Sequence, residues 1–254
     1  MKAIKMNNIF NITSSSQMKI PQFSKDPLKA MDFYMEYGFQ IEFNIWSELE
    51  MNGINEQANK MQACIGGDYL PIMHGDRKSS VFLRSAKNPR VIAIIEKLLG
   101  GRTSALQTVY YFGKPGTKGF PLHQDNFFVA SHADSFGSAW SPMVDVNPLR
   151  GGLIVYPGSH REPLLDVRET GLQSSPSQDV NAHKLECILP EKYSPVSVDV
   201  DAGCCVFLHG HSVHSSHPNQ SDIYRRVFLA TYIRQGAPFR PGNTAKRTET
   251  SLYD

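Results

Sequence analysis

The 254-residue sequence is poor in cysteine, lacks long apolar runs and has no marked excess of charge of either sign. Its four cysteines include the adjacent pair Cys204–Cys205, which is not the spaced framework of a disulfide-stabilised secreted protein. The apolar run RVIAIIEKLLGG is about half as long as a membrane-spanning helix and carries Glu96 and Lys97. Asparagines interrupt the apolar residues near the N-terminus, so no signal peptide is predicted. We therefore expect a cytoplasmic protein that has no membrane partner.

Charge and composition also exclude some classes of partner. Against 26 Lys and Arg residues stand 24 Asp and Glu residues, and the basic residues are dispersed along the chain. This pattern gives no argument for a nucleic-acid partner. A hydrophobic content of 41% is ordinary for a globular protein with a sizeable core, and the partner we expect is a small-molecule substrate.

Helix signals dominate residues 21–102, which we interpret as a mainly helical support that follows a loosely ordered arm at 1–20. Asp26 is a suitable N-cap, Pro27 suits the first helical position, and Gly38 ends the helical spacing of apolar residues. The polar stretch 45–63 predicts a second helix.

A third helix has the clearest boundaries. Asn88 and Pro89 precede apolar residues that recur on one helical face until Gly100. After it, residues 103–235 consist of short runs of β-forming residues separated by Gly, Pro, Asn and Ser. Helices followed by many strands predict an α+β chain, mainly β, whose catalytic half is a sandwich or barrel. We see no linker, so we expect residues 1–254 to form one domain, with 236–254 (including AKRTET) as a solvated tail.

The octapeptide FPLHQDNF at residues 120–127 carries the first chemical signal. If it is a strand, His123 and Asp125 point to one side and Gln124 to the other. An imidazole and a carboxylate aimed into one space are two of the three ligands of a facial iron site. Further along, the sequence FLHGHSVHSSHPNQSDIYRR offers candidates for the missing imidazole: His209, His211, His214 and His217.

Two kinds of metal site fit such ligands. A triad of two imidazoles and one carboxylate leaves metal positions open, as in non-haem Fe(II) oxygenases. A structural zinc site closes the shell with four protein ligands, and a catalytic zinc ion keeps three with one water. The histidine cluster HGHSVHSSH could supply a zinc site by itself, although its spacing is not that of a zinc finger.

Two adjacent arginines follow this cluster. On a strand, Arg225 and Arg226 face opposite sides, so one of them can point into a barrel. A guanidinium group matches a carboxylate in a bidentate way, which suits an acidic co-substrate.

Taken in order, K-P-G, HQD, a tryptophan, GLIVYPGSH, VHSSHPN and an arginine resemble the phytanoyl-CoA dioxygenase family of Fe(II)/2-oxoglutarate oxygenases, over about residues 85–235. The resemblance implies a double-stranded β-helix, which is a jelly roll of cupin-like form. It also implies Fe(II), 2-oxoglutarate and O2 as cofactor and co-substrates. In this chain LRGG replaces the Asn-Gly turn that relatives often have, which we interpret as a change in a loop and not at the iron.

Carried over residue by residue, the resemblance assigns iron binding and catalysis to His123, Asp125 and His214. His214 is chosen because Asn219 follows five residues later and Arg225 eleven residues later. The resemblance assigns the distal carboxylate of 2-oxoglutarate to Arg225. It places three further residues at the co-substrate pocket: Tyr110, Trp140 and Ser216.

Substrate contacts are expected from the segment 126–136, which we interpret as a loop over the open end of the barrel. Its candidate residues are Asn126, Phe128, His132 and Asp134. The predicted reaction is hydroxylation of an unactivated C–H bond of a small metabolite in specialised metabolism, with release of succinate and CO2. The alternatives are a zinc-dependent or non-oxidative enzyme, or a non-catalytic binding protein, on the same barrel.

Overall fold

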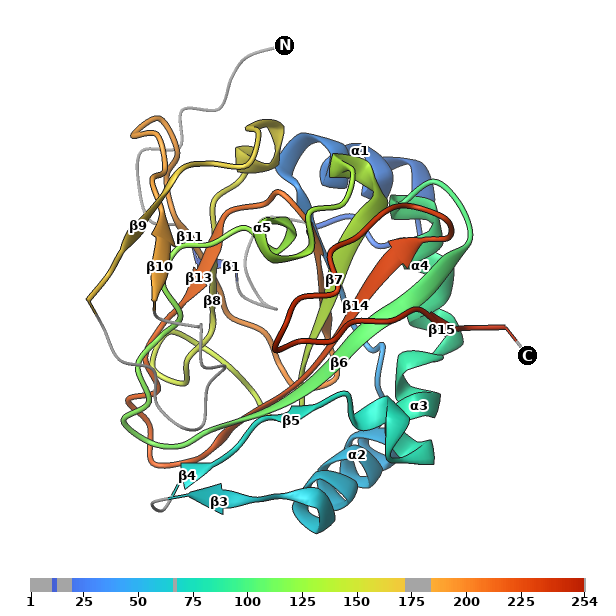
Figure 1. The fold of residues 1–254 in the computed structure, drawn as a ribbon, viewed down its shortest axis with the longest axis vertical. Coiled ribbons are helices and arrows are strands. Elements are labelled where there is room, and N and C mark those ends of the chain that lie inside the picture. The colour runs from blue at the N-terminus through green and yellow to red at the C-terminus, as the bar shows by residue number, and fades with distance from the viewer. Residues whose placement is uncertain (1–10, 13–19, 66–67, 172–183, 254) are drawn as a thin grey trace.

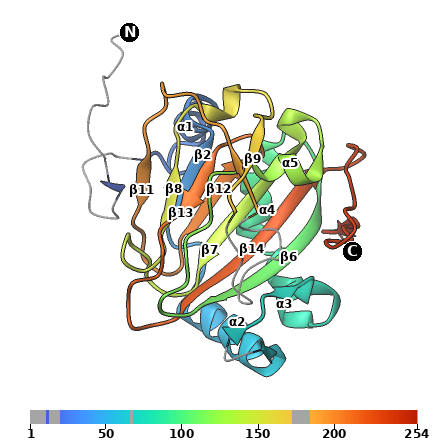
Figure 2. The same ribbon diagram turned by 60° about the vertical axis from the view of Figure 1, so that its left-hand side comes forward.

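A computed structural model describes residues 11–12, 20–65, 68–171 and 184–253. Most of the predicted arm at 1–20 lies outside these ranges. The larger of two facing sheets has the strand order β15-β6-β14-β7-β12-β2, with β5 paired to β6. Figure 2 shows its long strands side by side. Their bounds are β2 Phe39–Glu42, β5 Ile72–Met73, β6 Thr103–Gly113, β7 Phe136–Pro142, β12 Cys205–His209, β14 Arg225–Arg234 and β15 Thr250–Ser251.

The smaller sheet has the order β1-β11-β8-β13. Its strands are β1 Asn11–Ile12, β8 Leu153–Val155, β11 Val196–Val198 and β13 His214–Ser216. Two two-stranded sheets complete the described strands: β3 Cys64–Ile65 with β4 Asp68–Tyr69, and β9 Val167–Glu169 with β10 Leu185–Cys187. A buried apolar cluster lies between the two main sheets and includes Ile41, Val155, Val198 and Val206. The described chain is thus mainly β, with two packed sheets as in a jelly roll.

Helices cover the outer face of the larger sheet, opposite the smaller sheet (Figure 1). They are α1 Pro27–Tyr37, α2 Glu48–Met61, α3 Ser80–Ala86 and α4 Pro89–Leu98. All four start at side-chain caps: the carboxylate of Asp26 accepts from Lys29 N, Asn88 accepts from Arg90 N, Ser79 accepts from Val81 N, and Ser47 forms a capping box with Glu50. The α3 helix was not predicted, because its seven residues are too few to show a clear period.

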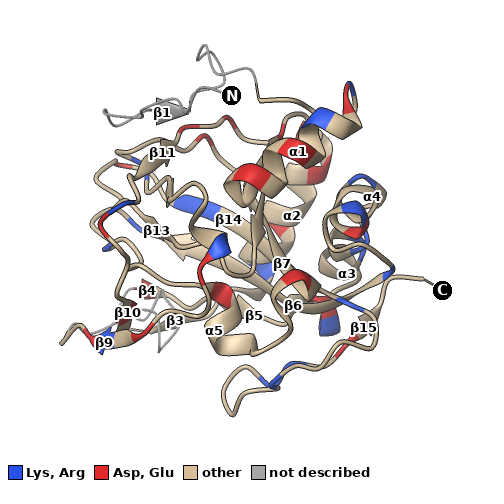
Figure 3. Ribbon diagram, turned by 90° about the horizontal axis from the view of Figure 1, so that it is seen from above, with Lys and Arg blue, Asp and Glu red and all other residues tan. Residues whose placement is uncertain are grey.

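Side chains of the larger sheet alternate between two cores. Along β14, Phe228 and Ala230 pack with the helices, whereas Val227 and Leu229 pack toward the smaller sheet. The same alternation along β6 decides which of its residues can reach the space between the sheets. Basic and acidic residues are interspersed along the ribbon (Figure 3), and none of the described helices has the length and apolar composition to cross a bilayer.

The C-terminal segment is not the solvated tail that was predicted. Strand β15 pairs with β6, and Leu252 is buried in the core beneath the helices. The guanidinium group of Arg77 donates to the carbonyl of Lys246, which holds the approach to β15. These contacts join residues far apart in sequence, so no local pattern could have indicated them.

Candidate metal centre

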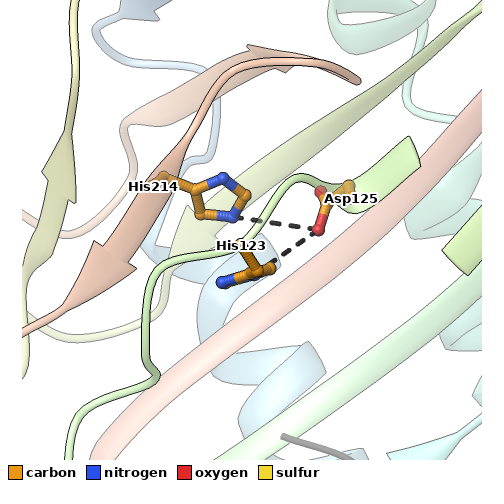
Figure 4. A group of neighbouring side chains, drawn as sticks. All are labelled: His123, Asp125 and His214. Carbon is orange, nitrogen blue, oxygen red and sulfur yellow. Dashed lines mark ion pairs between the residues drawn. The ribbon is translucent and has the colours of Figure 1, made fainter. Parts of the chain in front are cut away.

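Two imidazoles and one carboxylate converge between the two sheets (Figure 4). The backbones of His123 and His214 form an antiparallel bridge, in which each backbone N lies 3.0 Å from the carbonyl oxygen of the other residue. Oδ1 of Asp125 lies 3.6 Å from Nε2 of His123 and 3.8 Å from Nε2 of His214. The three candidate ligand atoms all lie within 4.8 Å of one another, which suits coordination of one ion.

Each candidate ligand residue is oriented by a hydrogen bond at its other side-chain atom, the one that does not face the common space. Nδ1 of His123 lies 2.8 Å from the carbonyl of Pro121, and Nδ1 of His214 lies 3.1 Å from the carbonyl of Ser212. If Nδ1 carries the proton in each ring, Nε2 presents its lone pair to the common space. The hydroxyl of Ser138 donates to Oδ2 of Asp125, which leaves Oδ1 directed at the imidazoles.

Burial and charge favour the ligating protonation states. Burial, followed by the neighbouring His214, lowers the pKa of His123 to about 4. Burial acts to raise the pKa of Asp125, but His214 and His123, together with the hydrogen bond from Ser138 and the charge of Arg247, outweigh it, so this pKa is lowered from its usual value. A neutral imidazole and an ionised carboxylate are the forms that bind a metal.

The predicted strand at HQD is only partly correct. His123 and Gln124 are extended, but Asp125 is the first residue of a five-residue helix, α5 Asp125–Val129. Gln124 does turn away from the triad, and its buried amide donates to the carbonyls of Pro163 and His211. The two ligands therefore meet through an extended residue followed by a helical turn, instead of through strand alternation.

The remaining histidines of the cluster bond elsewhere. Nε2 of His209 lies 3.1 Å from Asp134, and Nδ1 of His211 lies 3.1 Å from a backbone carbonyl. Nε2 of His217 lies 2.8 Å from the hydroxyl of Ser197. In the part of the chain that the structure describes, the triad is the one group of three or more potential ligands. The cluster therefore forms no closed four-ligand zinc site among these residues.

Arg225 is a buried cation beside the triad. Its Nη1 donates to the carbonyl of Gly151 at 3.0 Å and lies 3.5 Å from the hydroxyl of Ser216, whereas its buried Nε has no hydrogen-bond partner in the described part of the chain. Burial lowers its pKa to about 10. Within the described ranges no carboxylate pairs with it, so the residues present fit an external carboxylate. Arg226 faces outward and donates to Asn59.

Two cavities meet at the triad. The smaller, of about 80 Å³, is lined by the triad together with Trp140, Ser216 and Arg225. The larger, of about 650 Å³, shares His123 and Asp125 with it and lies within the size range of small-molecule sites. A molecule bound in either cavity would therefore lie beside His123 and Asp125.

Comparison with known proteins decides the family. The family model described as phytanoyl-CoA dioxygenase (PhyH) matches residues 55–227. The chain belongs to this family. A phytanoyl-CoA dioxygenase of Arabidopsis thaliana is 31% identical over 134 residues, covering 50% of this chain and 43% of the plant protein. The L-proline trans-4-hydroxylase of Streptomyces griseoviridis is 28% identical over 211 residues, covering 74% and 77%. The chain spans about half the length of the phytanoyl-CoA dioxygenases that it matches from plants and Caenorhabditis elegans.

Solved structures show the same fold. The carbocyclase SnoK from nogalamycin biosynthesis, described as non-heme and alpha ketoglutarate dependent, has a TM-score of 0.71 at 22% identity, covering 91% of this chain and 97% of SnoK. The epimerase SnoN, solved with Fe3+, alpha ketoglutarate and nogalamycin RO, has a TM-score of 0.68 at 23% identity, covering 85% and 88%. The predicted mainly β fold, a jelly roll, is therefore confirmed.

Of the co-substrate contacts expected for a phytanoyl-CoA dioxygenase relative, Trp140, Ser216 and Arg225 do line the smaller cavity. The prediction for Tyr110 is wrong. Its ring lies on the opposite face of β6, where it stacks on Phe82 and its hydroxyl donates to Asn55. The neighbouring Tyr111 lines both cavities instead.

Of the four predicted substrate contacts, one lines the larger cavity. Residues 125–135 fold as α5 and a 3-10 turn instead of a loop over the open end of the barrel. Phe128 lines the larger cavity. Asn126 is fully buried and bonds to the backbone of Ser131, while His132 and Asp134 are exposed at the surface and do not line the cavity.

Sequence reasoning missed the C-terminal wall of the larger cavity. The cavity is lined by the continuous segment Arg240–Ala245 and by Arg247. The only signal was the turn-forming Pro241–Gly242 pair, which indicates a change of direction but not where the segment packs.

Proposed function

We propose that this protein is an Fe(II)- and 2-oxoglutarate-dependent dioxygenase that hydroxylates an unactivated C–H bond of a small metabolite and releases succinate and CO2. One observation carries the proposal: the His123–Asp125–His214 triad shares a cavity with the buried guanidinium group of Arg225, which has no carboxylate partner among the described residues. A zinc hydrolase has no need of the second feature, and a binding barrel has no need of the first.

The residues have distinct roles in this proposal. His123, Asp125 and His214 would hold Fe(II), which would supply the activation of oxygen. Arg225 binds the distal carboxylate of 2-oxoglutarate, with the hydroxyl of Ser216 beside it. Trp140 lines the smaller cavity, where its apolar ring would help to exclude water from this ion pair and so strengthen it.

The larger cavity is the proposed substrate site. Phe128, Leu185 and Leu229 present apolar surface to it, and Gln107 and Thr231 add neutral polar groups. Asp125 is the single carboxylate among its described lining residues, and in this proposal that carboxylate would be bound to the metal. These features support a substrate with a largely apolar body and hydrogen-bonding substituents, and they disfavour a cation.

Relatives support the finer assignments. L-proline trans-4-hydroxylase, by its name, supports hydroxylation of a small molecule as the outcome. SnoK and SnoN are described as a carbocyclase and an epimerase from nogalamycin biosynthesis, which supports a role in specialised metabolism.

The test is formation of succinate from 2-oxoglutarate by metal-depleted protein reconstituted with Fe(II), during a screen of metabolite extracts. We expect succinate release that requires Fe(II) and rises when the extract contains the substrate. Zn(II) in place of Fe(II) and Asp125→Ala are the controls, and both should be inactive. Tight stoichiometric zinc in the purified protein, together with no visible charge-transfer band on anaerobic addition of Fe(II) and 2-oxoglutarate, would refute the proposal.

A further inference from the structure

The helix that begins with Asp125 is too short to be stable by itself. Helix α5 has five residues, and isolated helices of that length do not persist in water. Its start is held by the bond from Asn126 N to the carbonyl of Gly210. At its other end, the last carbonyls of a helix have no partners within the helix and need donors from elsewhere.

Those donors come from the C-terminal segment, more than a hundred residues along the chain. The side chain of Arg240 donates to the carbonyls of Phe127 and Phe128, and its backbone N–H donates to the carbonyl of Val129 at 2.6 Å. Nη1 of Arg247 donates to the carbonyl of Phe128 at 3.1 Å. Two guanidinium groups at the C-terminal end of a helix also complement its dipole.

The segment that carries these arginines is itself anchored to the larger sheet. Nε of Arg247 donates to the side-chain carbonyl of Gln107 on β6 at 3.1 Å. The ring of His74 bonds to the carbonyl of Ala245, and β15 follows as an edge strand on β6. The segment is therefore attached to the larger sheet, and through its arginines it can hold α5 in place.

We propose that Arg240 and Arg247 are positioning residues of the metal centre, which hold Asp125 in ligating geometry by fixing the end of α5. The inference rests on the proposed function only in taking Asp125 as a metal ligand. The same segment lines the larger cavity, so one element forms the substrate-side wall and supports a metal ligand.

The test compares arginines that make the same kind of contact at two different helices. Arg161 donates from Nη1 and Nη2 to the carbonyl of Glu36 near the end of α1, which carries no ligand. We would make Arg161→Met and the double variant Arg240→Met/Arg247→Met. For each full-length protein, Co(II) affinity is measured from its visible absorption, without 2-oxoglutarate, and the unfolding midpoint is measured without metal.

We expect the double variant to bind Co(II) about 10-fold or more weakly, the usual cost of losing outer support of a ligand. Arg161→Met should change Co(II) affinity less than about 2-fold, because Arg161 caps a helix that carries no metal ligand. Both proteins should show lowered unfolding midpoints. The double Lys variant, which keeps a donor at each position, should recover much of the affinity, and it serves also if the Met variant does not fold. Unchanged Co(II) affinity in the double variant, or an equal loss in Arg161→Met, would overturn the inference. Absence of Co(II) binding by the wild type would instead refute the proposed function.

Discussion

Replacement of Arg225 by Met has two effects of opposite sign. In the protein alone, the guanidinium group is buried without a carboxylate partner among the described residues, and its Nε lacks any hydrogen bond. A pKa of about 10, lowered from 12.5 by burial, corresponds to roughly 3 kcal/mol of penalty on the charged form. Because both values lie far above pH 7, this penalty is fully present at neutral pH and declines only as the pH rises through about 10. The Met variant should therefore unfold at a higher temperature than the wild type in the absence of ligand.

The co-substrate should show the reverse. In the variant, the distal carboxylate of 2-oxoglutarate would enter a buried site without its cation, at a cost of about 2–5 kcal/mol. At about 1.4 kcal/mol for each factor of ten, the affinity should fall by roughly one and a half to three and a half orders of magnitude. Lys at this position should recover only part of the loss, because an ammonium group lacks the planar fork.

The assay is thermal unfolding of apoprotein and metal-loaded protein over a 2-oxoglutarate titration. The control is Arg226→Met, because Arg226 is adjacent but faces outward and donates to Asn59. The control should keep the ligand-induced rise in midpoint, and Arg225→Met should lose it. Equal losses in the two variants, or a larger loss in Arg226→Met, would refute the assignment of the co-substrate cation.

Three further predictions concern the triad and its helix. Asp125→Ala should abolish turnover and weaken metal binding. Gln124→Ala should keep measurable metal affinity but lower the free energy of unfolding by about 2–4 kcal/mol, because two buried carbonyls lose their donor. Loss of metal binding in both variants would contradict this. His214→Ala should abolish metal binding in a Co(II) titration, and His217→Ala should change it little, since Nε2 of His217 bonds to a serine on β11; the reverse order would move the ligand by three residues. Ala130→Gly should raise the free energy of unfolding by up to about 1 kcal/mol in urea titrations, because Ala130 has a φ of +53°; a decrease would show that this backbone is unstrained.

Local signals predicted the parts of the structure that depend on neighbours in sequence. The caps at Asp26 and Asn88 start helices because side-chain oxygens satisfy nearby N–H groups, an effect confined to a few residues. The convergence of His123 and Asp125 was likewise a short-range inference. It survives although the segment is not a strand, since one extended residue followed by a helical turn also brings both side chains to one side.

The choice of face on β6 could not be predicted in this way. Tyr110 and Tyr111 are adjacent, and both faces of β6 are covered, one by helices and the other by the smaller sheet and the cavities. A strand buried on both faces shows no alternation of polar and apolar residues, so the pattern cannot tell which tyrosine faces the site. Only its pairing with β14, which places Tyr110 opposite Phe228 in the helix-facing core, decides the matter.

The co-substrate end of the cavity depends on backbone approach as much as on side chains. From the sequence, the LRGG run was interpreted as a change in a loop and not at the iron. It supplies the Gly151 carbonyl that accepts a hydrogen bond from Arg225. Gly151 has a φ of +67°, and a Cβ there would lie 2.9 Å from Cδ of Arg225. A Cβ at Gly119 would lie 1.9 Å from the carbonyl oxygen of Ser216, which is backbone and cannot move aside. Side chains at these two glycines would displace Arg225 and Ser216 together, so the pocket that receives the carboxylate is shaped by residues that contribute no functional group to it.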